Sequence, residues 1–208
     1  MWRNAPHSLR LKMKTQEGDS SPSSFFCLVF STFSLSLCRY NQGKGSTMIK
    51  KEQFVCPYTV YDHVDELNAD DAELMCKAHE AARNAYAPYS KFNVGAAVRL
   101  ANGAVVLGNN IENAAYPSGL CAERVAMFGA MAQYPGVPIQ ALAITAWSAA
   151  KAIEEPVAPC GSCRQVMVEV EQTSKCPLRV LCQGDTGPIM VFDGVESLMP
   201  FIFLDKFL

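Results

Sequence analysis

The chain has 208 residues, half of them apolar, and its 18 basic and 20 acidic side chains leave a formal net charge of −2. This size indicates one globular domain of about 100–200 residues plus some residues outside that domain. The near-balanced charge gives a polyanion little electrostatic attraction, so no nucleic-acid partner is expected and a small-molecule substrate is favoured.

The cysteines bear on the compartment of the protein. There are nine of them, an odd number, and several fall outside any repeated spacing. A small secreted domain would instead pair its cysteines in a disulfide framework. The pattern therefore favours a reducing compartment, the cytoplasm, with metal-bound and free thiols.

Residues 1–47 differ in composition from the rest of the chain. Basic residues at the start are followed by serines and then by the mostly apolar segment 25–37. Such an order is also what a targeting peptide offers, but serines interrupt the segment, and it is too short for a membrane span of about 20 residues. The sequence predicts a disordered or non-native extension over 1–47, with Met48 as a candidate start, a lead-in over 48–68 and the globular domain over 69–208.

After the lead-in, apolar residues recur with the periods of helices and strands. The first helical pattern stops at Pro88, and Asn102-Gly103 predicts a hairpin turn between two strands. Helices that alternate with strands imply a three-layer α/β/α domain. The predicted helices cover about 70–86, 121–133 and 160–172, with a last helical turn at 195–199, and the predicted strands cover 94–100, 104–108, 139–147, 178–182 and 188–192.

Two short stretches, CAER (121–124) and PCGSCRQ (159–165), contain the residue types of a metal site. Structural zinc normally takes four protein ligands, whereas catalytic zinc keeps a fourth position open for water. Cys121, Cys160 and Cys163 supply three thiols. The alternatives are a redox Cys-x-x-Cys pair, which does not need Cys121 or Glu123, and a structural zinc ribbon, which requires a second cysteine pair.

Both cysteine groups fall at predicted helix N-termini, where unpaired N–H groups and the helix dipole favour thiolate. Three thiolates and one Zn²⁺ carry a net charge of −1, which weakens the metal as a Lewis acid unless a cation compensates. Arg124 and Arg164 each directly follow a motif residue, and a guanidinium that donates to sulfur withdraws charge from the metal. We predict this charge-compensating role for Arg124; the alternative for both arginines is a surface position or a subunit contact.

Four ordered motifs make the chain resemble a known family, the small homotetrameric cytidine deaminases: YSKFNVGAA (89–97), NIENAAYP (110–117), CAER and PCGSCRQ. The resemblance covers about Ala69 to the C-terminus, and Cys-x-Glu followed by Pro-Cys-x-x-Cys is the zinc deaminase signature. It implies a three-layer α/β/α fold around a central mixed five-stranded sheet. It further implies that Cys121, Cys160 and Cys163 bind zinc and that Glu123 shuttles protons.

The resemblance also implies where a nucleoside binds. Asn110 and Glu112 would bind the ribose 3′-hydroxyl, and this pair suits the task because a carboxylate only accepts hydrogen bonds while an amide also donates. An ordinary polar loop is the alternative for these two residues. Phe92 would pack on the pyrimidine ring, with a plain core position as its alternative. The backbone N–H of Ala122 would contact the base carbonyl.

Three further residues are implied to act between subunits of a homotetramer with shared active sites. Ala114 and Tyr116 would reach a neighbouring subunit's site near the 5′-hydroxyl, and Phe203 would close the pocket of another subunit. The chain departs from the family pattern twice. Asn93 replaces the usual proline, and the apolar tail makes Phe201 a competitor of Phe203.

We therefore predict zinc-dependent hydrolytic deamination of cytidine and 2′-deoxycytidine to uridine and 2′-deoxyuridine with release of ammonia, as in pyrimidine salvage. A polynucleotide deaminase would need a basic groove, and histidine is more usual there as the first ligand. A deaminase of a cytosine-nucleoside antibiotic would share the metal motifs, but Asn110 and Glu112 favour a free ribose. A catalytically inactive zinc-binding scaffold would not need Glu123.

Overall fold

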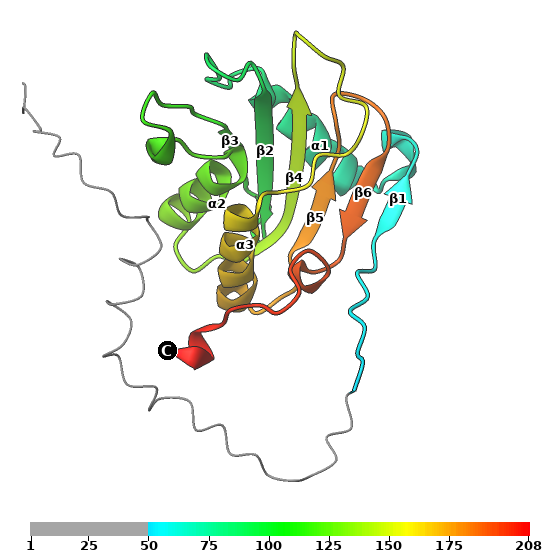
Figure 1. Ribbon diagram of the computed structural model, residues 1–208, viewed down its shortest axis with the longest axis vertical. Helices are drawn as coiled ribbons and strands as arrows, with labels where there is room; N and C mark the ends of the chain where they lie inside the picture. Colours follow the sequence, from blue (N-terminus) through cyan, green and yellow to red (C-terminus); the bar gives the residue numbers. More distant parts are fainter. Residues whose placement is uncertain (1–49) are drawn as a thin grey trace, which may run out of the picture. The chain divides into compact units, whose positions relative to one another are not determined.

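A mixed sheet of six strands lies at the centre of residues 50–208, the part of the chain that the computed structural model describes. The strand order is β1-β6-β5-β4-β2-β3, and within this sheet only the β4–β5 pair is parallel (Figure 1). The prediction for residues 1–47 lies outside the described residues. The strands are β1 (Thr59–Tyr61), β2 (Asn93–Leu100), β3 (Val105–Asn109), β4 (Ile139–Trp147), β5 (Arg179–Cys182) and β6 (Ile189–Phe192).

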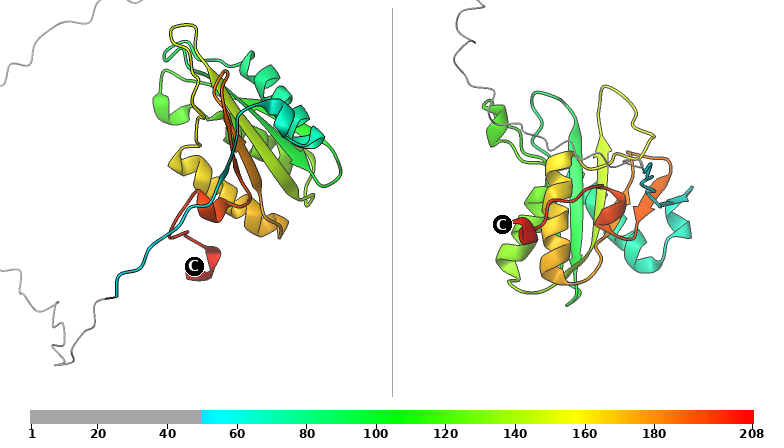
Figure 2. Two further views of the ribbon diagram at one scale, coloured as in Figure 1. Left: turned by 90° about the vertical axis from the view of Figure 1, so that its right-hand side faces the viewer. Right: turned by 60° about the horizontal axis from the view of Figure 1, so that its bottom comes forward.

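Three helices cover the two faces of this sheet. α1 (Ala69–Ala82) lies on one face, and α2 (Ala122–Gln133) and α3 (Gly161–Ser174) lie on the other (Figure 2). Alternate residues of each central strand face the two layers, as the period of a strand requires. In β4, Ala143 belongs to the apolar cluster under α1, whereas Ile144 belongs to the cluster under α2 and α3. The predicted three-layer α/β/α fold is confirmed.

The predicted number of five strands is wrong, because the sheet has a sixth strand, β1, at one edge. β1 has three residues and pairs antiparallel with β6, with Val60 opposite Met190. It comes from the segment 48–68, which was predicted as a lead-in. The three residues of β1 are mostly exposed and show no alternation of apolar and polar side chains. Their pairing as a strand therefore depends on the neighbouring strand β6 and not on a local sequence pattern.

α1 ends earlier than predicted, at Ala82 and not near Tyr86. The indole Nε1 of Trp147 donates to the carbonyl oxygen of Ala82 over 3.2 Å. Beyond the helix, Tyr86 forms an isolated parallel bridge with Ile111. Contacts from distant segments therefore end the helix, although its apolar period continues in the sequence.

Two glycines let the helices approach the sheet closely. A Cβ on Gly95 of β2 would collide with the backbone of α1, at the carbonyl oxygen of Ala78. A Cβ on Gly108 of β3 would collide with the backbone of α2, at the nitrogen of Ala126. Gly108 thus fixes the height of α2 above the sheet, and with it the first turn of that helix, where the predicted site residues Ala122, Glu123 and Arg124 lie.

Candidate active site

The three predicted ligand cysteines meet at the N-termini of α2 and α3. Cys121 is the N-cap of α2, Cys160 is the N-cap of α3, and Cys163 lies in the first turn of α3. Their sulfur atoms all lie within 4.8 Å of one another. Cys163 is fully buried, Cys121 is half-buried and Cys160 is exposed, so the cluster opens toward solvent on one side.

The spacing of the sulfurs fits zinc. Tetrahedral zinc with Zn–S bonds of about 2.3 Å places its sulfur ligands about 3.8 Å apart. The Sγ atoms of Cys121 and Cys160 are 3.9 Å apart, and those of Cys160 and Cys163 are 3.5 Å apart. Three thiols at this spacing leave one corner of the tetrahedron free, which is the arrangement of a catalytic zinc site.

The charge of the cluster also fits a dication. The neighbouring thiol of Cys163, and then the guanidinium of Arg124, stabilise the thiolate of Cys121 and lower the pKa of Cys121 to about 5. The pKa of Cys163 is raised, chiefly by the neighbouring sulfur of Cys121 and then by burial of the thiol. The cluster thus resists a second negative charge, and a divalent cation is needed to hold three thiolates together.

The two arginines of the motifs have different partners. Nη2 of Arg124 donates to Sγ of Cys121 over 3.5 Å, the contact expected of a charge-compensating residue. Arg164 instead donates through Nε to the carbonyl oxygen of Pro159 over 2.8 Å, and through Nη1 to that of Leu198 over 2.7 Å. Arg164 therefore holds the backbone before α3 to the backbone near Leu198. The effect of Arg124 on a bound metal stays a prediction.

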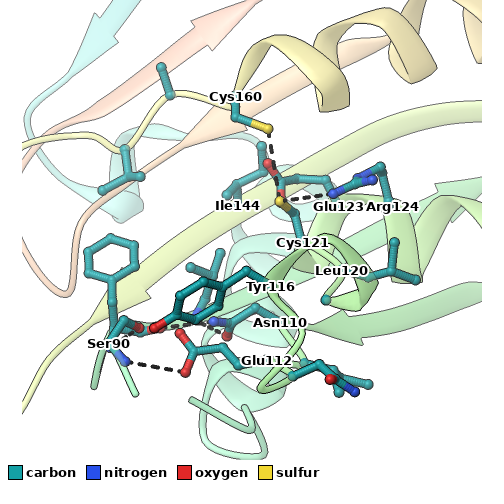
Figure 3. Close-up of a pocket in the computed structure, with 17 residues that line it drawn as sticks. Ser90, Asn110, Glu112, Tyr116, Leu120, Cys121, Glu123, Arg124, Ile144 and Cys160 are labelled. Carbon is teal, nitrogen blue, oxygen red and sulfur yellow. Dashed lines mark hydrogen bonds between the residues drawn. The ribbon is translucent and has the colours of Figure 1, made fainter. Parts of the chain in front are cut away.

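Glu123 lies in the first turn of α2 and is 4% exposed. Burial raises the pKa of this carboxyl, and the nearby charge of Cys121 raises it further. A raised pKa moves a carboxyl toward neutral pH, where it can both take and return a proton. Figure 3 shows Glu123 beside Cys121 and Cys160. The structure therefore brings the predicted general acid and base to the sulfur cluster.

The sulfur cluster forms one end of a cavity of about 580 Å³. Four other predicted residues, Phe92, Asn110, Glu112 and Tyr116, also line this cavity. In Figure 3 the last three of them lie at the end away from the cysteines. The cavity therefore joins a metal end to a polar end, and its volume falls in the usual range for small-molecule sites, about 300–1,000 Å³.

Asn110 and Glu112 bind backbone atoms at the start of β2 and in the loop that precedes it. Asn110 accepts from the N–H of Val94 over 2.8 Å and donates to the carbonyl oxygen of Phe92 over 2.9 Å. Oε2 of Glu112 accepts from the N–H groups of Tyr89 and Ser90 over 2.9 and 3.2 Å. Hydrogen bonding to Ser90 lowers the pKa of the Glu112 carboxyl. Both side chains thus shape the loop around Phe92 and keep further hydrogen-bonding capacity.

The remaining predicted residues differ in their distance from the cavity. Tyr116 is 73% exposed and lines the cavity of its own chain, where its ring lies edge-on to Tyr89. Ala122 is buried, and Ala114 is exposed away from the cavity lining. Phe203 is also outside the lining; Gln165 donates to its carbonyl oxygen over 3.1 Å. The cross-subunit contacts of Ala114, Tyr116 and Phe203 stay predictions.

Several lining residues were not predicted from the sequence. Some were detectable, because Ser90 and Val94 lie inside a motif and Val157 and Ala158 directly precede Pro159. Ile144 gave no local signal, since an isoleucine in a buried strand is ordinarily a core residue. The lining residues that were not predicted are Ser90, Val94, Ile111, Asn113, Gly119, Leu120, Ile144, Val157 and Ala158.

Comparison with known proteins agrees with this site. Residues 68–178 match the family region described as "Cytidine and deoxycytidylate deaminase zinc-binding region". The chain is 44% identical over 134 residues to a cytidine deaminase of Halalkalibacterium halodurans, a match that covers 64% of this chain and 94% of that protein. The chain belongs to the cytidine deaminase family. The predicted resemblance is confirmed.

Solved cytidine deaminase structures share the fold. A cytidine deaminase from Burkholderia pseudomallei has a TM-score of 0.55 and 40% identity, covering 63% of this chain and 97% of that one. One from Mycobacterium tuberculosis has a TM-score of 0.50 and 31% identity, covering 66% of this chain and 99% of that one. As a member of this family, the chain has zinc as its cofactor. Among residues 50–208, no helix has the length and apolar character needed to cross a bilayer.

Proposed function

We propose that this chain is a zinc-dependent cytidine deaminase that converts cytidine and 2′-deoxycytidine to the corresponding uridine nucleosides and ammonia. One observation carries the proposal: the cluster of three cysteine sulfurs and the buried Glu123 lie at one end of a cavity that has polar side chains at its other end. A nucleoside has matching parts, a reactive base carbon and a sugar.

Glu123 performs the proton transfers in this proposal. When bound by Cys121, Cys160 and Cys163, zinc lowers the pKa of water and thereby supplies a nucleophile near neutral pH. Glu123 takes one proton from the water and delivers it to ring N3 as the water oxygen bonds to C4. It then transfers the second proton to the amino group, the C4–N bond breaks, and ammonia and the C4 carbonyl form.

The polar end supports a nucleoside substrate over a nucleotide. Among residues 50–208, Arg124 is the only lysine or arginine that lines the cavity, and its guanidinium donates to Cys121. A phosphate would therefore find no free cation in the lining, while the carboxylate of Glu112 would repel it. We propose that Glu112 and Asn110 bind the ribose 3′-hydroxyl, that Phe92 packs on the base and that the N–H of Ala122 contacts its carbonyl oxygen.

Ammonia release from a panel of substrates tests the function. The panel is cytidine, 2′-deoxycytidine, cytosine, adenosine and single-stranded DNA, each with and without a zinc chelator. We expect turnover of the two cytosine nucleosides alone, with loss of turnover in chelator and recovery on zinc addition. Activity that is unchanged in the presence of the chelator, or that is higher with DNA or free cytosine than with the nucleosides, would contradict the proposal.

We also propose that the enzyme is a cytoplasmic homotetramer with shared sites. The free cysteines of the described residues suit a reducing compartment. Tyr116, Phe203 and Phe207 are more than half exposed, which suits contacts with other copies. Ala114 and Tyr116 would reach one neighbouring site and Phe203 another. Native mass spectrometry should give a tetramer, and a fully active monomer would exclude these cross-subunit roles.

A further inference from the structure

The connection between β4 and α3, residues 148–159, is part of the cavity wall. Val157 and Ala158 line the cavity, and the chain then enters Cys160 through the buried Pro159. This connection contains no helix or strand. Its position, and with it the position of one ligand cysteine, must therefore be set by contacts with other segments.

The turn after β5, residues 183–187, holds the middle of this connection. The backbone N–H of Asp185 donates to the carbonyl oxygen of Ile153 over 2.7 Å. A Cβ on Gly184 would collide with that same carbonyl oxygen, and a Cβ on Gly187 would collide with the carbonyl oxygen of Glu154. The two backbones thus fit against each other with no room for side chains at the contact.

Three polar side chains fix this turn from the α1 side of the molecule. The hydroxyl of Thr145, on β4, donates to the carbonyl oxygen of Gly184 over 2.6 Å. The amide of Gln183 donates to the carbonyl oxygen of Gly187 over 2.9 Å. Nε2 of His79, on α1, lies 2.9 Å from Oε1 of Gln183 and donates in the tautomer that a carbonyl oxygen requires.

Burying these polar side chains costs free energy of folding, because burial removes them from water. Thr145 is 1% exposed and Gln183 is 8% exposed. An apolar side chain at either position would avoid that cost and would suit the surrounding core. What the polar side chains provide is a defined position for the 183–187 turn.

We propose that Thr145, Gln183 and His79 are positioning residues that act through the 183–187 turn on the segment Val157–Cys160. None of the three lines the cavity, so they do not contact the substrate. They determine where Cys160 and the wall residues Val157 and Ala158 lie, and thereby how firmly the site retains zinc and how well it binds the nucleoside. This inference rests on the proposed function, since it concerns the same zinc site and the same substrate.

The test compares the zinc-loaded Thr145→Val and Thr145→Ser variants with the wild type. Valine keeps the shape of threonine and removes the hydroxyl, whereas serine keeps the hydroxyl. Groups that orient metal ligands typically change metal affinity or activity by about 10–100-fold. We expect about 10-fold faster zinc transfer to a chromogenic chelator and a raised KM for cytidine in Thr145→Val, at the low end because the effect passes through the loop. Thr145→Ser should restore both values.

The matched control is Asp71→Asn, which weakens a different buried polar group, on α1. Asp71 is 1% exposed and accepts from Arg179 over 2.8 Å and from Arg99 over 3.4 Å, with no contact to the 183–187 turn. This variant should lose thermal stability but keep the wild-type zinc transfer rate and KM. The inference is overturned if Thr145→Val behaves like Asp71→Asn, with a lower melting temperature and unchanged zinc transfer.

A second variant covers the case in which Thr145→Val does not fold. His79 is only half-buried, so His79→Leu is compatible with folding, and it removes the outermost bond of the set. We expect about 3-fold faster zinc transfer, below the range for groups that touch a ligand, together with faster hydrogen exchange in 150–158. Wild-type exchange and transfer rates would overturn the proposal. A wild type that binds no zinc or does not deaminate cytidine would instead reject the proposed function.

Discussion

The two ends of the cavity are built in different ways. At the metal end, Cys121 is the N-cap of α2, while Glu123 and Cys163 lie buried in the first turns of helices that pack on the sheet. At the polar end, which we propose to bind the sugar and therefore call the sugar end, Asn110 and Glu112 lie in loops and already bind the backbone around Phe92. Polar groups at the metal end are free for chemistry, whereas those at the sugar end also hold a loop in place.

This difference predicts that substitutions at the metal end abolish the reaction without disturbing the fold. Substitutions at the sugar end should reduce binding and also loosen the loop. Four variants test this difference between the two ends.

The largest effect is expected from Cys163→Ser at the metal end. A hydroxyl is a far poorer zinc ligand than thiolate, so the variant should lose its zinc, about one ion per chain in the wild type, and all measurable turnover. Metal content by mass spectrometry and ammonia release check this. Cys76→Ser, on the exposed side of α1, is the control and should keep both. Full zinc content in Cys163→Ser would remove the site from these cysteines.

Glu123→Gln should separate metal binding from catalysis. The amide fills the same space in the buried first turn of α2 but cannot accept and return a proton. General acid and base groups contribute about 10²–10⁴-fold, and since one carboxyl serves several transfers here, we expect a loss of kcat at the upper end. Zinc content and melting temperature should not change. Glu169→Gln, on the exposed side of α3, is the control; a loss of only a few-fold in Glu123→Gln contradicts the mechanism.

Glu112→Ala tests the sugar end. Loss of one hydrogen bond to a charged group lowers kcat/KM for cytidine about 10- to 150-fold. The wild type should prefer cytidine to 3′-deoxycytidine, and the variant should nearly lose that preference while it retains zinc. Glu112→Gln keeps an acceptor for the N–H groups of Tyr89 and Ser90 and so isolates the charge. If the wild type uses 3′-deoxycytidine as well as cytidine, the ribose assignment fails.

Gly108→Ala should have the smallest effect on activity and a clear effect on stability. The new Cβ would collide with the backbone of α2, and overpacking of this kind costs about 1–3 kcal/mol. The shifted first turn should reduce turnover a few-fold. Gly129→Ala, on α2 itself, is the control, because its Cβ would meet Val106 Cγ1 at an ordinary 3.5 Å and alanine favours a helix by about 1 kcal/mol. Urea denaturation should give the lowest free energy of unfolding for Gly108→Ala, a higher one for the wild type and the highest for Gly129→Ala.

The sequence predicted most of the core elements because their signals are local. β4 was predicted at its observed bounds, since a long apolar run between turn residues is typical of a buried strand. β1 and the early end of α1 were not predicted. In both cases the cause is a distant segment, β6 for the first and Trp147 for the second.

The metal end of the site was predictable for a similar reason. Cys160 and Cys163 are one helical turn apart, and Cys121 and Glu123 are neighbours in the chain, so short motifs place the side chains. By contrast, Thr145 contacts Gly184, which is 39 residues away in the sequence, and Gln183 contacts His79, which is 104 residues away. No motif covers such distances, and only the fold brings these residues together beside the segment that leads to Cys160.

The packing beneath the cysteines bears on the order in which the enzyme is assembled. Met127 of α2 and Met167 of α3 are fully buried in one apolar cluster with Ile144 of the sheet. The starts of both helices are therefore held by the core, unlike the ligands of a zinc finger, whose fold depends on the metal. We therefore expect the chain to fold first and to take up its metal afterwards, through the exposed side of Cys160. Withdrawing zinc should then inactivate the enzyme without unfolding it, and the activity should return when zinc is supplied again.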